Sequence, residues 1–136
     1  MNETINTIIS RRSIKAYTDQ MVSDHLLHEI TSAATYSGSG MNKLSAMMVV
    51  IKDKALRDKL SKLNASILGT DKDPFYNAPV VIVVLADSNV RTYIEDGSLV
   101  MGNLMNASYS VGVSSCWIHR AKEMFETEEG KQLLKE

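Results

Sequence analysis

The chain has 136 residues, of which 44% are hydrophobic, and it carries a formal net charge of −1 at pH 7. This length and composition suit one folded domain with a substantial core, so we expect a single domain over residues 1–136. Without an overall positive charge the chain has no field to attract a phosphate backbone, and the composition argues against nucleic-acid binding.

The first expected element is a short helix that leads into a basic segment. Ile5, Ile8 and Ile9 recur at helical spacing, and this helix should end near Ser10. Residues 11–17 follow with the sequence Arg-Arg-Ser-Ile-Lys-Ala-Tyr. The helix would therefore deliver a run of cations at its end.

In an extended conformation the basic segment would present Arg11, Ser13 and Lys15 on one side and Arg12 on the other. A guanidinium can bind phosphate oxygens in bidentate fashion, and lysine adds a mobile point charge. Such a set suits a phosphorylated or anionic small ligand. The alternative is an ordinary solvated strip of surface charge, because short basic runs are weak motifs.

The second expected helix is capped by Ser23 and repeats Leu26, Leu27 and Ile30 on one face. A segment rich in glycine, serine and asparagine follows, over residues 33–42. Its glycines allow close backbone approach and its polar side chains supply donors and acceptors, so it could wrap a polar ligand. It could equally be a plain helix-to-strand turn.

The remaining elements alternate between strands and helices. Residues 47–51 and the apolar run 80–86 are predicted strands, and the second should be central and covered on both faces. Asp53 is expected to cap a helix that carries Leu56, Leu60, Leu63 and Ile67. A long helix over residues 93–110 should end at Gly112, followed by an inner strand at 113–118 and a last helix capped by Thr127.

Four segments in this order resemble the FMN-dependent nitroreductase family. The basic segment matches an Arg-(Arg/His)-Ser-x-(Lys/Arg)-x-(Tyr/Phe) motif, and residues 38–42 match the family's Pro-Ser-x-x-Asn loop. Residues 73–79, Asp-Pro-Phe-Tyr-Asn-Ala-Pro, and residues 103–118 resemble the family's middle and its long helix with the following strand. The resemblance spans nearly the whole chain and implies an α+β fold with a mixed central sheet flanked by helices.

The resemblance also implies a set of cofactor contacts. Arg11, Arg12 and Ser13 would hold the phosphate and ribityl chain of FMN, and Lys15 would lie near the N1 and O2 edge of the flavin. Ser39 and Asn42 match loop residues that reach a flavin bound across a homodimer interface.

The implied activity is an FMN-dependent oxidoreductase that passes two electrons from NADH or NADPH through the flavin to a nitro-aromatic, quinone or similar small acceptor. The resemblance gives no catalytic side chain beyond the flavin contacts. Gly38 stands where the family has proline, and Leu44-Ser45-Ala46 where it has Gln-Pro-Trp. The chain is expected to lack the family's C-terminal strand and tail. The alternative hypothesis is therefore a non-catalytic flavin-binding remnant or a flavin-storage protein of the same fold.

Other chemistries have little support in the sequence. His25 and His28 are three residues apart, but no further ligand completes a metal site, and none is expected. Cys116 is the only cysteine, which fits a reducing compartment, and its apolar setting favours packing over nucleophilic chemistry. No apolar stretch has the length of a membrane span, so we expect a cytoplasmic protein without membrane contact.

Overall fold

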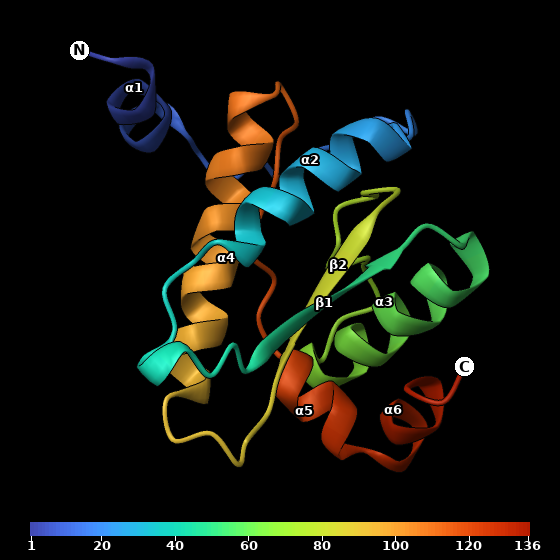
Figure 1. Cartoon of the computed structure of the whole chain (residues 1–136). Helices are drawn as coiled ribbons and strands as arrows, with labels where there is room; N and C mark the ends of the chain where they lie inside the picture. The colour runs from blue at the N-terminus through green and yellow to red at the C-terminus, as the bar shows by residue number, and fades with distance from the viewer. The chain divides into compact units, whose positions relative to one another are not determined.

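The computed structural model describes all residues 1–136, which form two compact units (Figure 1). Unit 1 comprises residues 1–14, 22–49 and 82–117, and unit 2 comprises residues 15–21, 50–81 and 118–136. The segments of both units are interleaved along the chain. Each unit therefore depends on contacts between residues that are distant in sequence.

Unit 1 contains three helices, a 3-10 turn and most of two strands, whereas unit 2 contains three helices. The elements of unit 1 are α1 (Glu3–Ser10), α2 (Asp24–Thr35), η1 (Gly40–Asn42), β1 (Ala46–Ile51), β2 (Val81–Ala86) and α4 (Tyr93–Ser110). The helices of unit 2 are α3 (Lys54–Leu68), α5 (Ala121–Glu126) and α6 (Glu128–Leu133).

Local side-chain chemistry sets the starts of most helices, as the sequence predicts. The side chains of Ser23, Asp53 and Thr127 accept hydrogen bonds from backbone amides in the first turns of α2, α3 and α6. Gly112 follows the end of α4 with a φ of 80°, a left-handed conformation that glycine adopts without steric cost. The predicted starts of α2, α3 and α6 and the predicted end of α4 are confirmed.

The core of unit 1 lies between two crossing helices and one face of the sheet (Figure 1). Ile30 and Ala34 of α2 pack against Val100 and Leu104 of α4, and inward residues of both strands pack on this cluster. The backbone amide of Asp87, after β2, donates to the carbonyl of Ser45, before β1, at 2.9 Å. The two-stranded sheet is therefore antiparallel.

The sheet is smaller than the sequence predicts, although the α+β class is confirmed. Residues 113–118 form no strand and pair only through an isolated parallel bridge between Ser13 and Ser115. The prediction that β2 is a central strand is wrong, because the sheet has only two strands, and all six β2 residues are half-buried on both faces rather than fully covered. The physical reason is that each strand of a two-stranded sheet has one edge without a strand partner. Within unit 1, inward residues of β2 such as Ile82 and Val84 pack against the core formed by α2 and α4.

Unit 2 is built on α3, whose inner face combines leucines with buried polar groups. Leu60 and Leu63 are buried beside Asn64, and α5 and α6 contact this helix. The Asn64 amide donates to the carbonyl of His119 at 3.0 Å and accepts from Arg120 Nε at 3.0 Å. These bonds fix the start of α5, a helix that the sequence analysis did not predict. No helix of either unit is long and apolar enough to cross a lipid bilayer.

Candidate functional site

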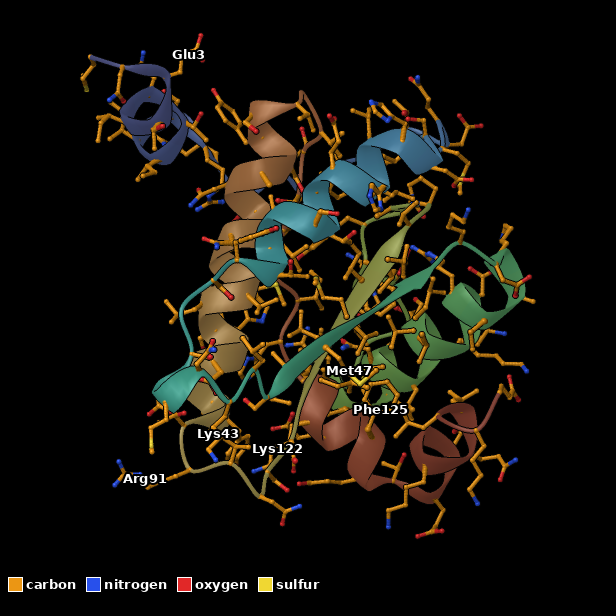
Figure 2. The ribbon with its side chains drawn as sticks, viewed as in Figure 1. Glu3, Lys43, Met47, Arg91, Lys122 and Phe125 are labelled. Carbon is orange, nitrogen blue, oxygen red and sulfur yellow. The ribbon has the colours of Figure 1, made fainter.

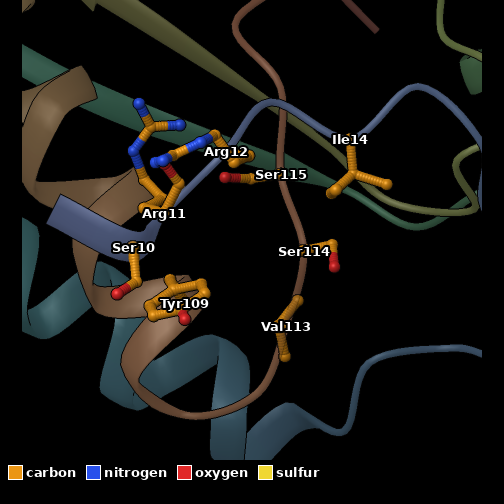
Figure 3. Close-up of a pocket in the computed structure, with 8 residues that line it drawn as sticks. All are labelled: Ser10, Arg11, Arg12, Ile14, Tyr109, Val113, Ser114 and Ser115. Carbon is orange, nitrogen blue, oxygen red and sulfur yellow. The ribbon is translucent and has the colours of Figure 1, made fainter. Parts of the chain in front are cut away.

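A pocket in unit 1 lies at the junction of the N-terminal basic segment and the end of α4 (Figure 3). Its volume is about 180 Å³. The lining residues are Ser10, Arg11, Arg12, Ile14, Tyr109, Val113, Ser114 and Ser115. Both predicted arginines thus face a common hollow whose remaining polar groups are hydroxyls.

Two polar atoms of this pocket are buried without a hydrogen-bond partner. They are Nη1 of Arg11 and Oγ of Ser115. Buried polar groups in folded proteins are nearly always satisfied, so an orphaned guanidinium nitrogen and an orphaned hydroxyl in one pocket indicate a place for an external acceptor. An anionic oxygen accepts strong, charge-assisted bonds from guanidinium.

The Arg12 guanidinium bonds to the backbone and also lines the pocket. Its Nη1 donates at 2.8 Å to the carbonyls of both Ile9 and Arg11, which lie at the end of α1. Figure 3 shows the Arg11 and Arg12 side chains on the same side of the pocket, with the Ser115 side chain pointing toward them. The strict alternation predicted for an extended segment does not hold, because Arg11 directly caps the helix and both long side chains reach the hollow.

Ser13 and Lys15 are exposed, and neither is among the residues that line this pocket. Ser13 pairs through its backbone with Ser115, and the following amide of Ile14 donates to the Ser115 carbonyl at 3.1 Å. Lys15 begins the first segment of unit 2. The pairing therefore holds the basic segment beside residues 113–115.

The second predicted set, Ser39 and Asn42, lies in the segment between α2 and β1. The Ser39 hydroxyl accepts a hydrogen bond from the Leu44 amide at 3.2 Å, and Asn42 is exposed. A second hollow of about 220 Å³ lies beneath this segment, and its lining includes Ser39, Ser45 and Ala46. Ser39 and Asn42 are close in the fold but do not line the pocket of the arginines.

The same hollow is lined by Asp96, a residue that the sequence analysis missed. Asp96 is only 2% exposed and accepts hydrogen bonds from the Gly40 amide, the Ser45 hydroxyl and the Thr92 hydroxyl. The bonds from Ser45 and Gly40 lower the pKa of this carboxyl against the opposing effect of burial. An acidic residue in the first turn of a helix is common, so the sequence alone offered no signal for this role.

The other candidates form no site. His25 lies 3.7 Å from Glu29 on an exposed face of α2, and His28 contacts Ser32. No group of three or more potential metal ligands is present. Cys116 is half-buried, and its thiol donates a weak hydrogen bond to the Trp117 carbonyl at 3.8 Å.

Comparison with known proteins places this geometry in context. The model of the nitroreductase family matches residues 8–70, which include both predicted site segments. A relative from Archaeoglobus fulgidus, named NADH dehydrogenase/NAD(P)H nitroreductase, is 30% identical to this chain over 123 residues. The match covers 87% of this chain and 68% of that protein. The chain spans smaller shares, 60% and 37%, of two further relatives.

Solved structures agree with the sequence matches. A nitroreductase with bound FMN from Bacteroides fragilis superposes with a TM-score of 0.91 over 99% of this chain and 79% of that chain, at 22% identity, which shows a shared fold. A nitroreductase with bound FMN from Desulfitobacterium hafniense is 27% identical, with a TM-score of 0.78 over 93% of this chain and 80% of that chain. Together with the match to the Archaeoglobus relative, these findings show that the chain belongs to the nitroreductase family.

Proposed function

We propose that the chain is an FMN-dependent oxidoreductase that takes two electrons from NADH or NADPH and delivers them to a nitro-aromatic, quinone or similar small acceptor. Family membership and the FMN-bound structures of the same fold support the cofactor and the reaction class. A cytoplasmic location belongs to this proposal, because a single half-buried cysteine suits a reducing compartment.

The observation that carries the proposal is the pair of orphaned polar atoms in the arginine-lined pocket. Nη1 of Arg11 and Oγ of Ser115 lack partners inside the protein, and the phosphate of FMN would supply acceptor oxygens for both. The pocket volume of about 180 Å³ is below the range of whole-cofactor sites, roughly 300–1,000 Å³. The pocket therefore suits the phosphate end of FMN and leaves the isoalloxazine to be held elsewhere.

The chain's own residues bind and orient the cofactor, whereas FMN supplies the transfer of hydride and electrons when bound. Arg11 and Arg12 would hold the phosphate, with Ser13 at the ribityl chain. Lys15 would place a positive charge at the pyrimidine edge, where negative charge develops on reduction. No acidic or basic side chain is assigned to proton transfer, which solvent can perform.

We further propose that the active form is a homodimer with FMN at the subunit interface. Apolar side chains are exposed along α1, on α4 and in the segment between α2 and β1, namely Ile5, Ile8, Ile9, Ile94, Leu99, Met41 and Leu44. A dimer interface would cover such side chains, since contiguous exposed apolar surface is typical of protein interfaces. Ser39 and Asn42 would then reach the flavin of the partner subunit.

Absorbance spectroscopy of the purified protein tests the function directly. We expect yellow protein, or colourless protein that takes up added FMN, and bleaching of the flavin band on anaerobic addition of NADH or NADPH. Colour without bleaching would favour a non-catalytic flavin-binding protein. Failure to bind FMN would contradict the proposal, and sedimentation of a stable monomer would contradict the dimer.

A single substitution tests the proposed contact between Arg11 and the FMN phosphate. Arg11→Ala removes a charge-assisted contact, and we expect FMN to bind about 10- to 100-fold more weakly. Arg91→Ala is the matched control, because Arg91 is exposed and extends into solvent (Figure 2). Fluorescence titration of FMN measures both, and equal affinities would refute the assignment of Arg11.

A further inference from the structure

The segment that carries Ser39 and Asn42 has a backbone conformation that it does not favour by itself. Met41, Asn42 and Leu44 have φ values of 52°, 54° and 50°. Residues with a side chain rarely adopt this left-handed region, and each costs free energy that the surroundings must supply. Something outside the segment therefore holds it in place.

Asp96 provides that hold from the first turn of α4. Its Oδ1 accepts from the Gly40 amide at 2.9 Å, and its Oδ2 accepts from the Ser45 hydroxyl at 2.6 Å. The two donors lie on either side of the three left-handed residues. The carboxylate thus clamps both ends of residues 40–45 to one helix.

Thr92 completes the clamp, because its hydroxyl also donates to Asp96 Oδ2, at 3.2 Å. Asp96 forms no salt bridge. Lys43 and Arg91, the basic residues nearest in sequence to this loop and to the start of α4, extend into solvent (Figure 2). Every bond that Asp96 accepts therefore comes from the loop or from the turn that precedes α4. A buried carboxylate used in this way positions backbone rather than balancing a charge.

Gly40 is required for the close approach of loop and helix. A Cβ built on Gly40 would lie 2.8 Å from the Cβ of Thr92 and would overlap its hydroxyl oxygen. The Thr92 Cβ cannot rotate away as the end of a flexible side chain can. A larger residue at position 40 should therefore push the loop away from α4 and weaken the bond from the residue-40 amide to Asp96.

We propose that Asp96 is a positioning residue for FMN, which fixes residues 40–45 so that Ser39 and Asn42 are presented in one orientation. The proposal rests on the proposed function, because it assumes that this loop contacts the flavin. In this proposal Asp96 acts through the loop, because its carboxylate oxygens are occupied by bonds from Gly40, Ser45 and Thr92. Its loss should leave the fold in place and release the loop.

The test compares Asp96→Ala with Asp73→Ala in the purified chain of 136 residues. Asp73 is also a loop-organising carboxylate, but it lies in unit 2. For Asp96→Ala we expect faster amide hydrogen exchange at Gly40, FMN binding weakened about tenfold, and an altered visible circular dichroism of the bound flavin at saturating FMN. Asp73→Ala should lower thermal stability without any of these three effects.

Two further variants keep the test decisive if Asp96→Ala fails to fold. Ser45→Ala removes the shorter of the two hydroxyl bonds to Oδ2 but keeps the carboxylate, and Gly40→Ala displaces the loop but keeps every other group. Both should weaken FMN binding in the same direction. Wild-type protein that takes up no FMN overturns the proposed function itself. Wild-type protein that binds FMN while the Asp96 and Asp73 variants show equal affinity overturns only the role of Asp96.

Discussion

Asp96 in unit 1 and Asp73 in unit 2 both hold a loop in place, but only Asp73 also pairs with a cation. Each carboxylate accepts backbone and hydroxyl hydrogen bonds, and each holds a loop that contains left-handed residues. In the Asp73 loop these are Tyr76 and Asn77, with φ values of 53° and 63°. In both units a carboxylate, buried for Asp96 and half-buried for Asp73, therefore stabilises unfavourable loop backbone.

The two clusters differ in their counter-charge. Asp73 forms a salt bridge with Arg57, whose side chain is itself buried and also donates to the Ala78 carbonyl at 2.9 Å. Asp96 forms none. A charge pair with many fixed partners makes a rigid structural site, whereas a carboxylate held only by an amide and two hydroxyls leaves its loop dependent on a few bonds. The second arrangement suits a loop that must meet a ligand.

The largest expected effect comes from removing Arg57, the cation that pairs with Asp73 in unit 2. Arg57→Ala leaves Asp73 and the Ala78 carbonyl without their partner and removes the guanidinium packed 5.5 Å from the centre of the Phe75 ring. We expect the free energy of unfolding, measured by urea denaturation, to fall by about 3 kcal/mol. Lys59→Ala is the control on the same helix, because its salt bridge with Glu136 is exposed. Equal losses would mean that Asp73 does not depend on its counter-charge.

A pair of close-approach glycines gives the next comparison. In unit 2, a Cβ on Gly130 would lie 2.7 Å from the carbonyl carbon of Met124 and overlap the carbonyl oxygen. Because backbone cannot yield as a side-chain end does, Gly130→Ala should cost about 2 kcal/mol in urea denaturation. It should not change FMN affinity, whereas Gly40→Ala should act mainly on FMN affinity. If both variants shift the same quantity, the distinction between a structural and a ligand-facing cluster is wrong.

The smallest effect is a pH dependence that belongs to Asp73. Burial raises the pKa of this carboxyl, but bonds from Ser61, Arg57 and two backbone amides outweigh it and lower the pKa from 3.8 to about 2. The stabilisation is fully present above pH 3.8 and is lost as the pH falls toward 2, because the unfolded state binds the proton first. After allowance for solvent screening we expect about 1 kcal/mol. Urea denaturation between pH 4 and pH 2 should show a shallower decline in Asp73→Asn, and an unchanged decline would contradict the lowered pKa.

Features that depend on neighbouring residues could be predicted from the sequence. The caps at Ser23 and Asp53 and the left-handed Gly112 involve bonds within one helical turn, so their residue types are sufficient evidence. By contrast, α5 begins after Arg120, a left-handed N-cap residue whose side chain makes no capping bond. Its start is held by Asn64, 56 residues away in sequence, which no local pattern reveals.

The candidate site divides in the same way. The cations of residues 11–15 and the polar loop around Ser39 carry recognisable residue types in recognisable order, and the family resemblance based on them is confirmed. Their assignment as flavin contacts stays a prediction. Asp96 was missed because its partners Gly40 and Ser45 are 56 and 51 residues distant, and one aspartate in a helix carries no mark of such contacts.

The contacts of Arg12 have a consequence for the choice of arginine at this position. Both backbone bonds at the end of α1 use the same nitrogen, Nη1, so Nε and Nη2 remain for another acceptor. A guanidinium presents donors along several directions at once, whereas the ammonium of lysine is a single point. One side chain can thus serve as helix cap and anion clamp together, and a lysine there would keep the charge while giving up one of the two tasks.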